Sequence, residues 1–218
     1  MNGTFDGNRQ GEVSLNSQIH TGAGDVDIQM TQDANREFKG TIGTQGINLK
    51  QILNDEKLGQ VVAQFNVEGT WHHQQKPDIK VVGAVEQMDY NGYSFGNIAF
   101  NGAYMQKAIS GELSIDDPNL QAQLSGEVTE DVFEQSPQKA KRIRLEGAIT
   151  RFAPSATKLS EQFGNAAFSG HIDADFTAHN LNDAQGSLRI SNFTVTGTEK
   201  DKPYQLISRS EERFSRNA

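Results

Sequence analysis

The sequence predicts an all-β protein built as an elongated, curved and mostly antiparallel sheet with two short helices. Apolar and polar residues alternate over seven stretches, which is typical of strands with one apolar and one polar face. Each stretch has one glycine on its apolar side, where a strand can bend. Hydrophobic residues make up only 35% of the 218 residues, with 21 glycines besides. Large side chains are therefore too few for a second apolar layer.

Eleven strands are expected along the chain. They cover residues 11–19, 24–31, 36–43, 60–70, 78–88, 94–104, 107–115, 119–129, 142–150, 167–177 and 185–195. Turn-forming sequences separate many of them, among them Thr21-Gly22-Ala23-Gly24, Asn91-Gly92 and Asp116-Asp117-Pro118-Asn119. Apolar residues at near-helical spacing predict short helices at Ile47–Asn54 and Ser155–Phe163, the second capped by Ser155.

An internal repeat of about 107 residues relates two parts of the chain, roughly 11–115 and 119–196. The aligned pairs are Phe38/Leu145, Gly40/Gly147, Ile42/Ile149, Phe65/Ile172, Val67/Ala174, Val13/Leu120 and Leu15/Ala122. A unit that repeats along one axis and touches only its neighbours is typical of solenoids. Residues 1–196 are thus expected to form one segment of repeating sheet, and residues 197–218 a terminal strand or polar tail.

Charge and composition exclude several classes of function. A net charge of −8 and a pI near 5.1 argue against nucleic-acid binding, which needs clustered Lys and Arg. The absence of cysteine excludes disulfides and thiolate metal sites. Aliphatic runs such as Val61–Ala63 are far shorter than the roughly 18 residues of a membrane helix. No signal peptide precedes the strand-like Asn2-Gly3-Thr4-Phe5, so we expect a piece of a longer chain.

No group of residues predicts catalysis, a metal site or a cofactor. His171, Asp173 and Asp175 share one strand face about 7 Å apart, but that face is polar, where charged residues are expected. His72 and His73 are adjacent and point to opposite faces, which makes them poor joint ligands.

Three further motifs favour structural roles. Thr44-Gln45-Gly46 precedes a helix but lacks the Gly-Lys-Ser/Thr signature of a nucleotide loop. Asp116-Asp117 precedes a proline, which predicts a turn rather than a pair of catalytic carboxylates. The basic patch Lys139–Arg144 has the chemistry to bind anionic lipid headgroups. The nearby acids Glu130, Asp131 and Glu134 favour a solvated loop instead.

The candidate functional site is the apolar side of the strands. Ordinary core packing is the alternative, because apolar strand faces usually pack against another layer. Two features favour an open groove: little helix to cover the strands, and glycines that leave the face hollow. Each buried methylene contributes about 0.8 kcal/mol, so such a groove holds acyl chains without specific polar contacts. The expected lining residues are Val61, Ala63, Phe65, Val67, Ile79, Val81, Ile98, Phe100, Leu113, Leu120, Leu124, Ile143, Leu145, Ile149, Phe168, Ile172 and Phe176.

Three segments resemble TamB-type translocation and assembly modules, within the wider AsmA-like group of bacterial envelope proteins. They are Gly46–Gly59 with Val67-Glu68-Gly69, Ile109–Leu120 with Leu124-Ser125-Gly126, and Ile172–Thr177 with Gly186–Phe193. Together they cover most of residues 3–196, and their order and combination carry the resemblance. Ser208–Phe214 does not resemble the family.

The resemblance implies a long periplasmic protein, anchored in the inner membrane by a helix absent from this chain, with a β-taco sheet folded over an apolar groove. It implies that the groove carries phospholipid between the inner and outer membranes. The alternative is a scaffold or chaperone for outer-membrane protein translocation and assembly. The implied partners are phospholipid acyl chains, neighbouring segments of the same chain and an outer-membrane barrel protein. A third alternative, a polysaccharide-binding or polysaccharide-cleaving β protein, lacks the expected aromatic platforms and clustered carboxylates.

Overall fold

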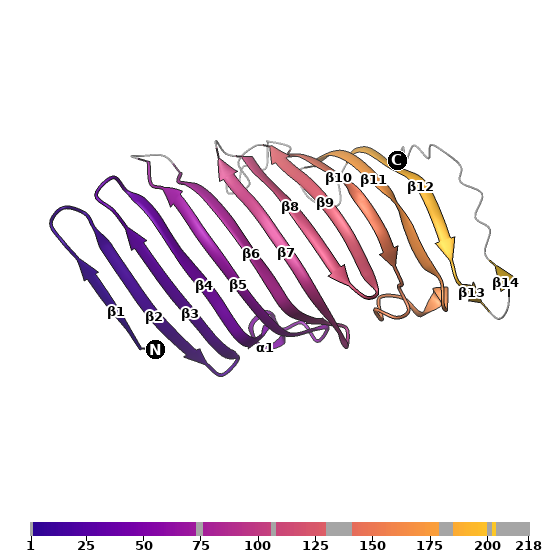
Figure 1. Cartoon of the computed structure of the whole chain (residues 1–218), viewed down its shortest axis with the longest axis horizontal. Coiled ribbons are helices and arrows are strands. Elements are labelled where there is room, and N and C mark those ends of the chain that lie inside the picture. Colours follow the sequence, from indigo (N-terminus) through magenta and orange to yellow (C-terminus); the bar gives the residue numbers. More distant parts are fainter. Residues whose placement is uncertain are drawn as a thin grey trace. The chain divides into compact units, whose positions relative to one another are not determined.

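The computed structural model describes residues 2–72, 76–105, 108–129, 141–178, 185–199 and 202–203. These residues form antiparallel strands with very little helix, so the all-β class is confirmed (Figure 1). The chain divides into two compact units, Met1–Gln106 and Lys107–Ala218, called unit 1 and unit 2 below.

Unit 1 is an open antiparallel meander, in which each strand pairs with the next one along the chain. Its strands are β1 (Asn2–Gly7), β2 (Val13–Thr21), β3 (Gly24–Gln32), β4 (Glu37–Asn48), β5 (Leu58–Thr70), β6 (Asp78–Tyr90) and β7 (Tyr93–Met105). A helix of one turn, α1 (Leu49–Leu53), connects β4 to β5 and packs against β5. It contributes no buried side chain.

Unit 2 repeats the meander with β8 (Ala108–Asp117), β9 (Leu120–Thr129), β10 (Lys141–Phe152), β11 (Ala167–Ala178) and β12 (Gln185–Thr196). A three-residue 3₁₀ helix, η1 (Glu161–Phe163), precedes β11. Beyond β12, the two-residue strands β13 (Thr198–Glu199) and β14 (Lys202–Pro203) pair with each other.

All eleven expected strands are present, most of them one or two residues longer than expected. Strand β1 was missed because its six residues contain two glycines and only one large apolar residue, Phe5, which is 70% exposed. Its backbone nevertheless pairs with β2 over its whole length, with Phe5 opposite Leu15. Partner strands, rather than apolar alternation, hold this segment extended.

The first expected helix is present but shorter, and of the second expected helix only the last three residues are helical. Residues 154–158 form turns, and only η1 follows. The hydroxyl of the fully buried Thr157 donates to the carbonyls of Ala153 and Pro154, both at 3.1 Å. Ser155 does not cap a helix: its hydroxyl donates to the Ser160 carbonyl at 2.9 Å. Such side-chain bonds to nearby carbonyls favour turns over a helix.

The turns predicted at Asn91-Gly92 and at Asp116–Asn119 are confirmed. Asn91 and Gly92 both have positive φ, 52° and 76°, as the central residues of a type I′ hairpin turn require. At the turn between β8 and β9, the Asp117 carboxylate accepts the Asn119 amide at 2.8 Å. The Asp116-Asp117 pair therefore belongs to a turn, as expected.

The order strand, short helical segment, strand occurs in both units: β4, α1 and β5 in unit 1, and β10, η1 and β11 in unit 2. At an offset of 107 residues β4 and β5 overlap β10 and β11, but α1 falls just before η1, so the repeat stays a prediction. The alignment of β2 with β9 does not fit this order. Strand β3 separates β2 from β4, whereas β9 pairs directly with β10. The counterpart of β3 would fall at residues 131–139, outside the described residues.

Candidate functional site

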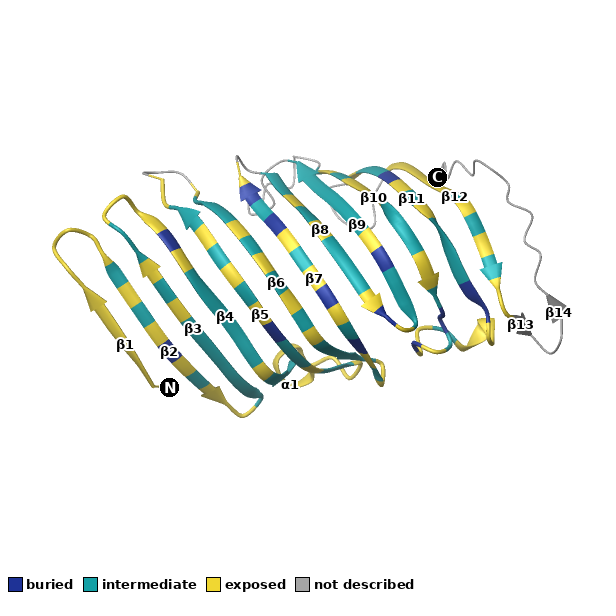
Figure 2. Cartoon of the chain, in the orientation of Figure 1, coloured by how far each residue is buried: buried dark blue, intermediate teal, exposed yellow. Residues whose placement is uncertain are grey.

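The strand register of unit 1 gathers the apolar rows on one side of the sheet. Phe65 on β5 lies opposite Gly83 on β6, which in turn lies opposite Phe100 on β7. The residues predicted to line a groove in this unit all share that side. They are Val61, Ala63, Phe65, Val67, Ile79, Val81, Ile98 and Phe100. Burial and exposure alternate along β7, where Ile98 is 8% exposed and its neighbours Asn97 and Ala99 are exposed (Figure 2).

The same side continues over β2, β3 and β4, which the predicted site left out. The added large apolar residues are Val13, Leu15, Ile19, Val26, Ile28, Met30, Phe38, Ile42 and Ile47. Their alternation was visible in the sequence, but their rows are shorter and are interrupted by Ser17, Gln32 and Thr44. We call this whole side the unit-1 apolar face.

The unit-1 apolar face also includes Met88 and Phe95, although strict alternation along β6 and β7 would place both on the polar side. Between β5 and β6 the register shifts by one residue near Glu86, and opposite it on β7 Asn97 has φ of 54°. The side-chain alternation of both strands therefore changes side at this level. As a result, Met88 and Phe95 lie opposite each other on the unit-1 apolar face, and Phe95 is only 5% exposed.

Unit 2 has an apolar face of the same construction. Leu113, Leu124, Gly147, Ile172 and Ile190 lie opposite one another in turn, from β8 through to β12. The predicted lining residues of this unit share the face: Leu113, Leu120, Leu124, Ile143, Leu145, Ile149, Phe168, Ile172 and Phe176. The register thus places these residues on one side of the sheet, and their contact with a ligand stays a prediction.

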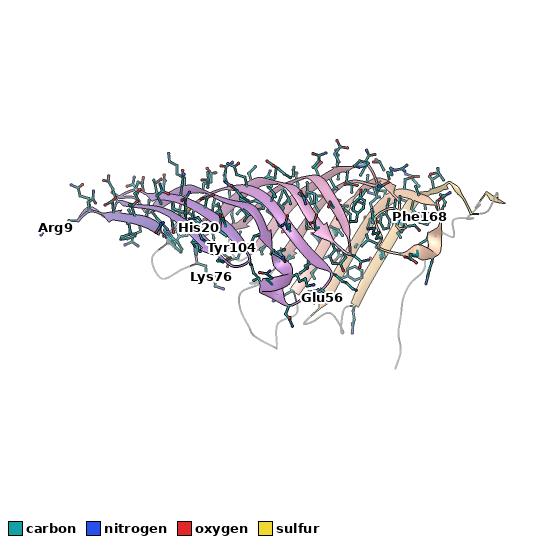
Figure 3. The ribbon with its side chains drawn as sticks, turned by 90° about the horizontal axis from the view of Figure 1, so that it is seen from below. Arg9, His20, Glu56, Lys76, Tyr104 and Phe168 are labelled. Atoms are coloured by element: carbon teal, nitrogen blue, oxygen red, sulfur yellow. The ribbon has the colours of Figure 1, made fainter. Side chains whose placement is uncertain are left out.

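Within the part of the chain that the structure describes, no second layer packs on either apolar face. The elements that pack closely are neighbouring strands, together with α1 against β5. Figure 3 shows α1 on one side of the unit-1 ribbon, with side chains tipped by nitrogen and oxygen rising from the other. In unit 2, large apolar residues consequently stay partly open to solvent: Leu145 is 36%, Leu188 44% and Ile190 49% exposed.

The glycines do not hollow the unit-1 apolar face, and this part of the prediction was wrong. A Cβ added to Gly69 would lie 2.5 Å from the Phe38 ring, and one added to Gly83 would lie 2.4 Å from the Phe65 ring. Each glycine therefore makes room for an aromatic ring of the neighbouring strand, a pairing that stabilises glycines within sheets. The face is a surface of close-fitting side chains rather than a row of holes.

Two hollows in the structure are lined mainly by polar residues, although Val13, Phe38 and Ile79 of the unit-1 apolar face also border the one in unit 1. In unit 1 a hollow of about 910 Å³ is lined by residues that include Asp6, Ser14, Thr31, Lys39 and Glu68. In unit 2 a hollow of about 390 Å³ is lined by residues that include Ser125, Glu127, Arg144, Glu146 and Asp173. Of the predicted lining residues, only Ile79 borders the first hollow and Leu145 the second. The hollows therefore do not coincide with the predicted site.

The polar residues of β10 and β11 pair with each other. The Arg142 guanidinium donates two hydrogen bonds to the Asp175 carboxylate, at 2.9 and 2.6 Å, and Arg144 lies 3.5 Å from it. The hydrogen bond from Arg142 lowers the pKa of Asp175, and the same bond raises the pKa of Arg142. These two members of the basic patch thus lie in a strand rather than a loop, while Lys139 and its acidic neighbours lie outside the described residues.

Two other polar candidates, His72 and Thr44, also have structural partners. His72 lies 2.9 Å from the Asp78 carboxylate, and His73 lies outside the described residues. Thr44 is part of β4, where its hydroxyl donates to the Val61 carbonyl at 3.0 Å. No group of three potential metal-binding His, Cys, Asp or Glu residues occurs in the described ranges.

At the hairpin end of β6, Asp89 joins three strands. Its carboxylate accepts hydrogen bonds from Ser94 at 2.6 Å, from the Gln87 side chain at 2.9 Å and from the Gln60 amide at 3.4 Å. The hydrogen bond from Ser94 is the main reason that the pKa of Asp89 is lowered. The carboxylate therefore ties β5, β6 and β7 together.

Comparisons with protein-family models, curated proteins and solved structures gave no match. Among the described residues, no helix has the length and apolar character needed to cross a membrane. The two apolar faces and the sequence resemblance are therefore the features that bear on function.

Proposed function

We propose that this chain is a segment of an envelope-spanning protein of the TamB or AsmA-like type, whose apolar faces carry phospholipid between the inner and outer membranes. The observation that carries the proposal is the pair of apolar faces without a second layer among the described residues. Large exposed apolar patches mark binding sites on soluble proteins. The parent protein is proposed to be periplasmic and anchored in the inner membrane, with no enzymatic activity and no cofactor.

Acyl chains fit these faces for an energetic reason. A bound chain removes apolar surface from water on both partners, which contributes about 25 cal/mol for each Å² buried. The exposed part of Leu188 and Ile190 supplies such surface without any polar group that would need a partner. Binding of this kind depends on apolar area rather than on headgroup chemistry, so the protein is expected to accept many phospholipids.

The test is lipid extraction and mass spectrometry on the purified chain, with an unrelated acidic β protein prepared alongside. Val81 and Val82 supply a matched pair of variants, because they are adjacent on β6 and point to opposite sides. Val81→Glu is expected to abolish co-purifying phospholipid, and Val82→Glu to leave it unchanged, since Val82 is 49% exposed on the polar side. A stable wild-type chain without bound lipid would contradict the proposal.

A second candidate function, assistance in outer-membrane protein assembly, is favoured by the outer strands. β1 pairs only with β2 and β12 only with β11 among the described strands. Each carries a single charged residue, Asp6 and Arg189 respectively. Strands with few charges can accept an added strand from another chain. A peptide from an outer-membrane barrel strand should then slow amide hydrogen exchange in β1 or β12, and unchanged exchange would count against this role.

A further inference from the structure

We propose that Phe163 closes one end of the unit-2 apolar face, so that a bound acyl chain lying along β11 ends at this ring. The inference rests on the function proposed above and adds to it a residue that determines which chain lengths bind best. Phe163 belongs to η1, outside the strands, and is 41% exposed.

The ring of Phe163 meets the apolar face at the first residue of the β11 row. It packs edge to face on Phe168, with centroids 5.1 Å apart, and Phe168 stacks on Phe193 of β12 at 5.9 Å. Phe168 lies on the same side of the sheet as Phe152, its partner on β10. In unit 2 this contact brings a segment outside the strands onto the apolar face, as the contact of Trp71 with Phe38, with centroids 5.2 Å apart, does in unit 1.

The segment that carries Phe163 is held in place from both sides. Before it, the amides of Thr157 and Leu159 donate to the carbonyls of Ala153 and Pro154, and the Ser160 hydroxyl accepts the Gln162 amide at 3.4 Å. After it, the Ala166 amide donates to the Phe163 carbonyl at 2.9 Å, and Ala166 is 2% exposed. These bonds fix the backbone that carries the ring, and the ring itself packs on Phe168, so that it can act as an end wall.

The β11 row beyond this wall is long enough for an acyl chain. From Phe168 to Phe176 it spans eight residue steps, or about 26 Å at roughly 3.3 Å per step. For comparison, one leaflet of a bilayer has a hydrocarbon thickness of about 15 Å. The row is free of charge on its apolar side, where Gly170, Ile172 and Ala174 lie between the two phenylalanines.

A chain-length series tests the inference. Saturated lysophosphatidylcholines of increasing length are titrated into the full chain, and the affinity is measured for each. Every methylene that reaches the face should raise the affinity about fourfold, since about 0.8 kcal/mol corresponds to that factor. The affinity should reach a plateau once the acyl chain is long enough to meet the Phe163 ring. In Phe163→Ala the plateau should move to a longer chain.

Leu159→Ala is the matched control, because Leu159 is 42% exposed in the same segment and is not part of the ring stack. It should keep the wild-type plateau, and equal unfolding midpoints should verify that both variants are folded. An unchanged plateau in Phe163→Ala would overturn the inference while leaving the proposed function intact. Absence of binding by every lipid of the series would overturn both.

Discussion

Replacing Gly83 by alanine should destabilise unit 1, because the glycine makes room for its neighbours on the apolar face. The added Cβ would lie 2.3 Å from the Gln64 carbonyl oxygen, 2.4 Å from the Phe65 ring and 2.8 Å from the Phe65 Cα. Contacts under 3.0 Å essentially never occur for real Cβ atoms. The ring can rotate, but the two backbone atoms cannot move without shifting β5. Overpacking of this kind lowers the free energy of unfolding by about 1–3 kcal/mol.

Gly43→Ala is the matched control on β4, since the nearest atom to its added Cβ is the Ala63 carbonyl oxygen at 3.8 Å. Alanine restricts the unfolded chain, so this variant should be as stable as the wild type or up to about 1 kcal/mol more stable. Urea denaturation measures both as changes in midpoint at constant slope. Adding Phe65→Leu to Gly83→Ala should restore part of the loss. If Gly83→Ala is as stable as Gly43→Ala, the account of the ring over the glycine is refuted.

Three further predictions follow from the strands and turns. Leu124→Glu should leave the protein folded, as measured by circular dichroism, but free of lipid. Gln123→Glu, on the polar side, should keep the lipid. If Leu124→Glu unfolds the protein, the apolar face is instead a packed core. Asn91→Ala should lower the free energy of unfolding by about 1 kcal/mol in a urea titration, because φ there is 52°, and Asn91→Gly should not. Arg142→Gln should raise the pKa of Asp175 toward its ordinary 3.8, measured by carboxyl-carbon NMR. Because the native pKa is lowered, this ion pair stabilises the fold above about pH 4, and the stabilisation is lost as the pH falls through the native pKa.

The strands could be predicted because the apolar alternation and the turn residues indicate the same structure. Around Asn91-Gly92, for example, two alternating rows meet at a dipeptide that favours positive φ, which determines both the hairpin and its register. Once the register is determined, the apolar rows must share one side of the sheet. The side on which most candidate residues lie was therefore predictable from the sequence alone.

Three features could not be predicted, for different physical reasons. β1 has no apolar pattern, since its extended backbone depends on pairing with β2. The change of side near Asn97 comes from a backbone φ that the alternation does not report, so the position of Phe95 on the apolar face could not be predicted. The filling of space beside Gly83 depends on which ring lies across the strand, and that requires the register. In each case the missing information is a contact with another strand.

Photo-crosslinking from two adjacent positions on β5 tests the central claim most directly. Phe65 lies on the unit-1 apolar face and Gln64 on the polar side of the same strand. A photoreactive amino acid is placed at one position or the other, the chain is purified from cells and irradiated, and the intact mass is measured. The account predicts a phospholipid adduct from the position of Phe65 and none from that of Gln64. Equal labelling from both positions, or no adduct from the position of Phe65, would contradict it.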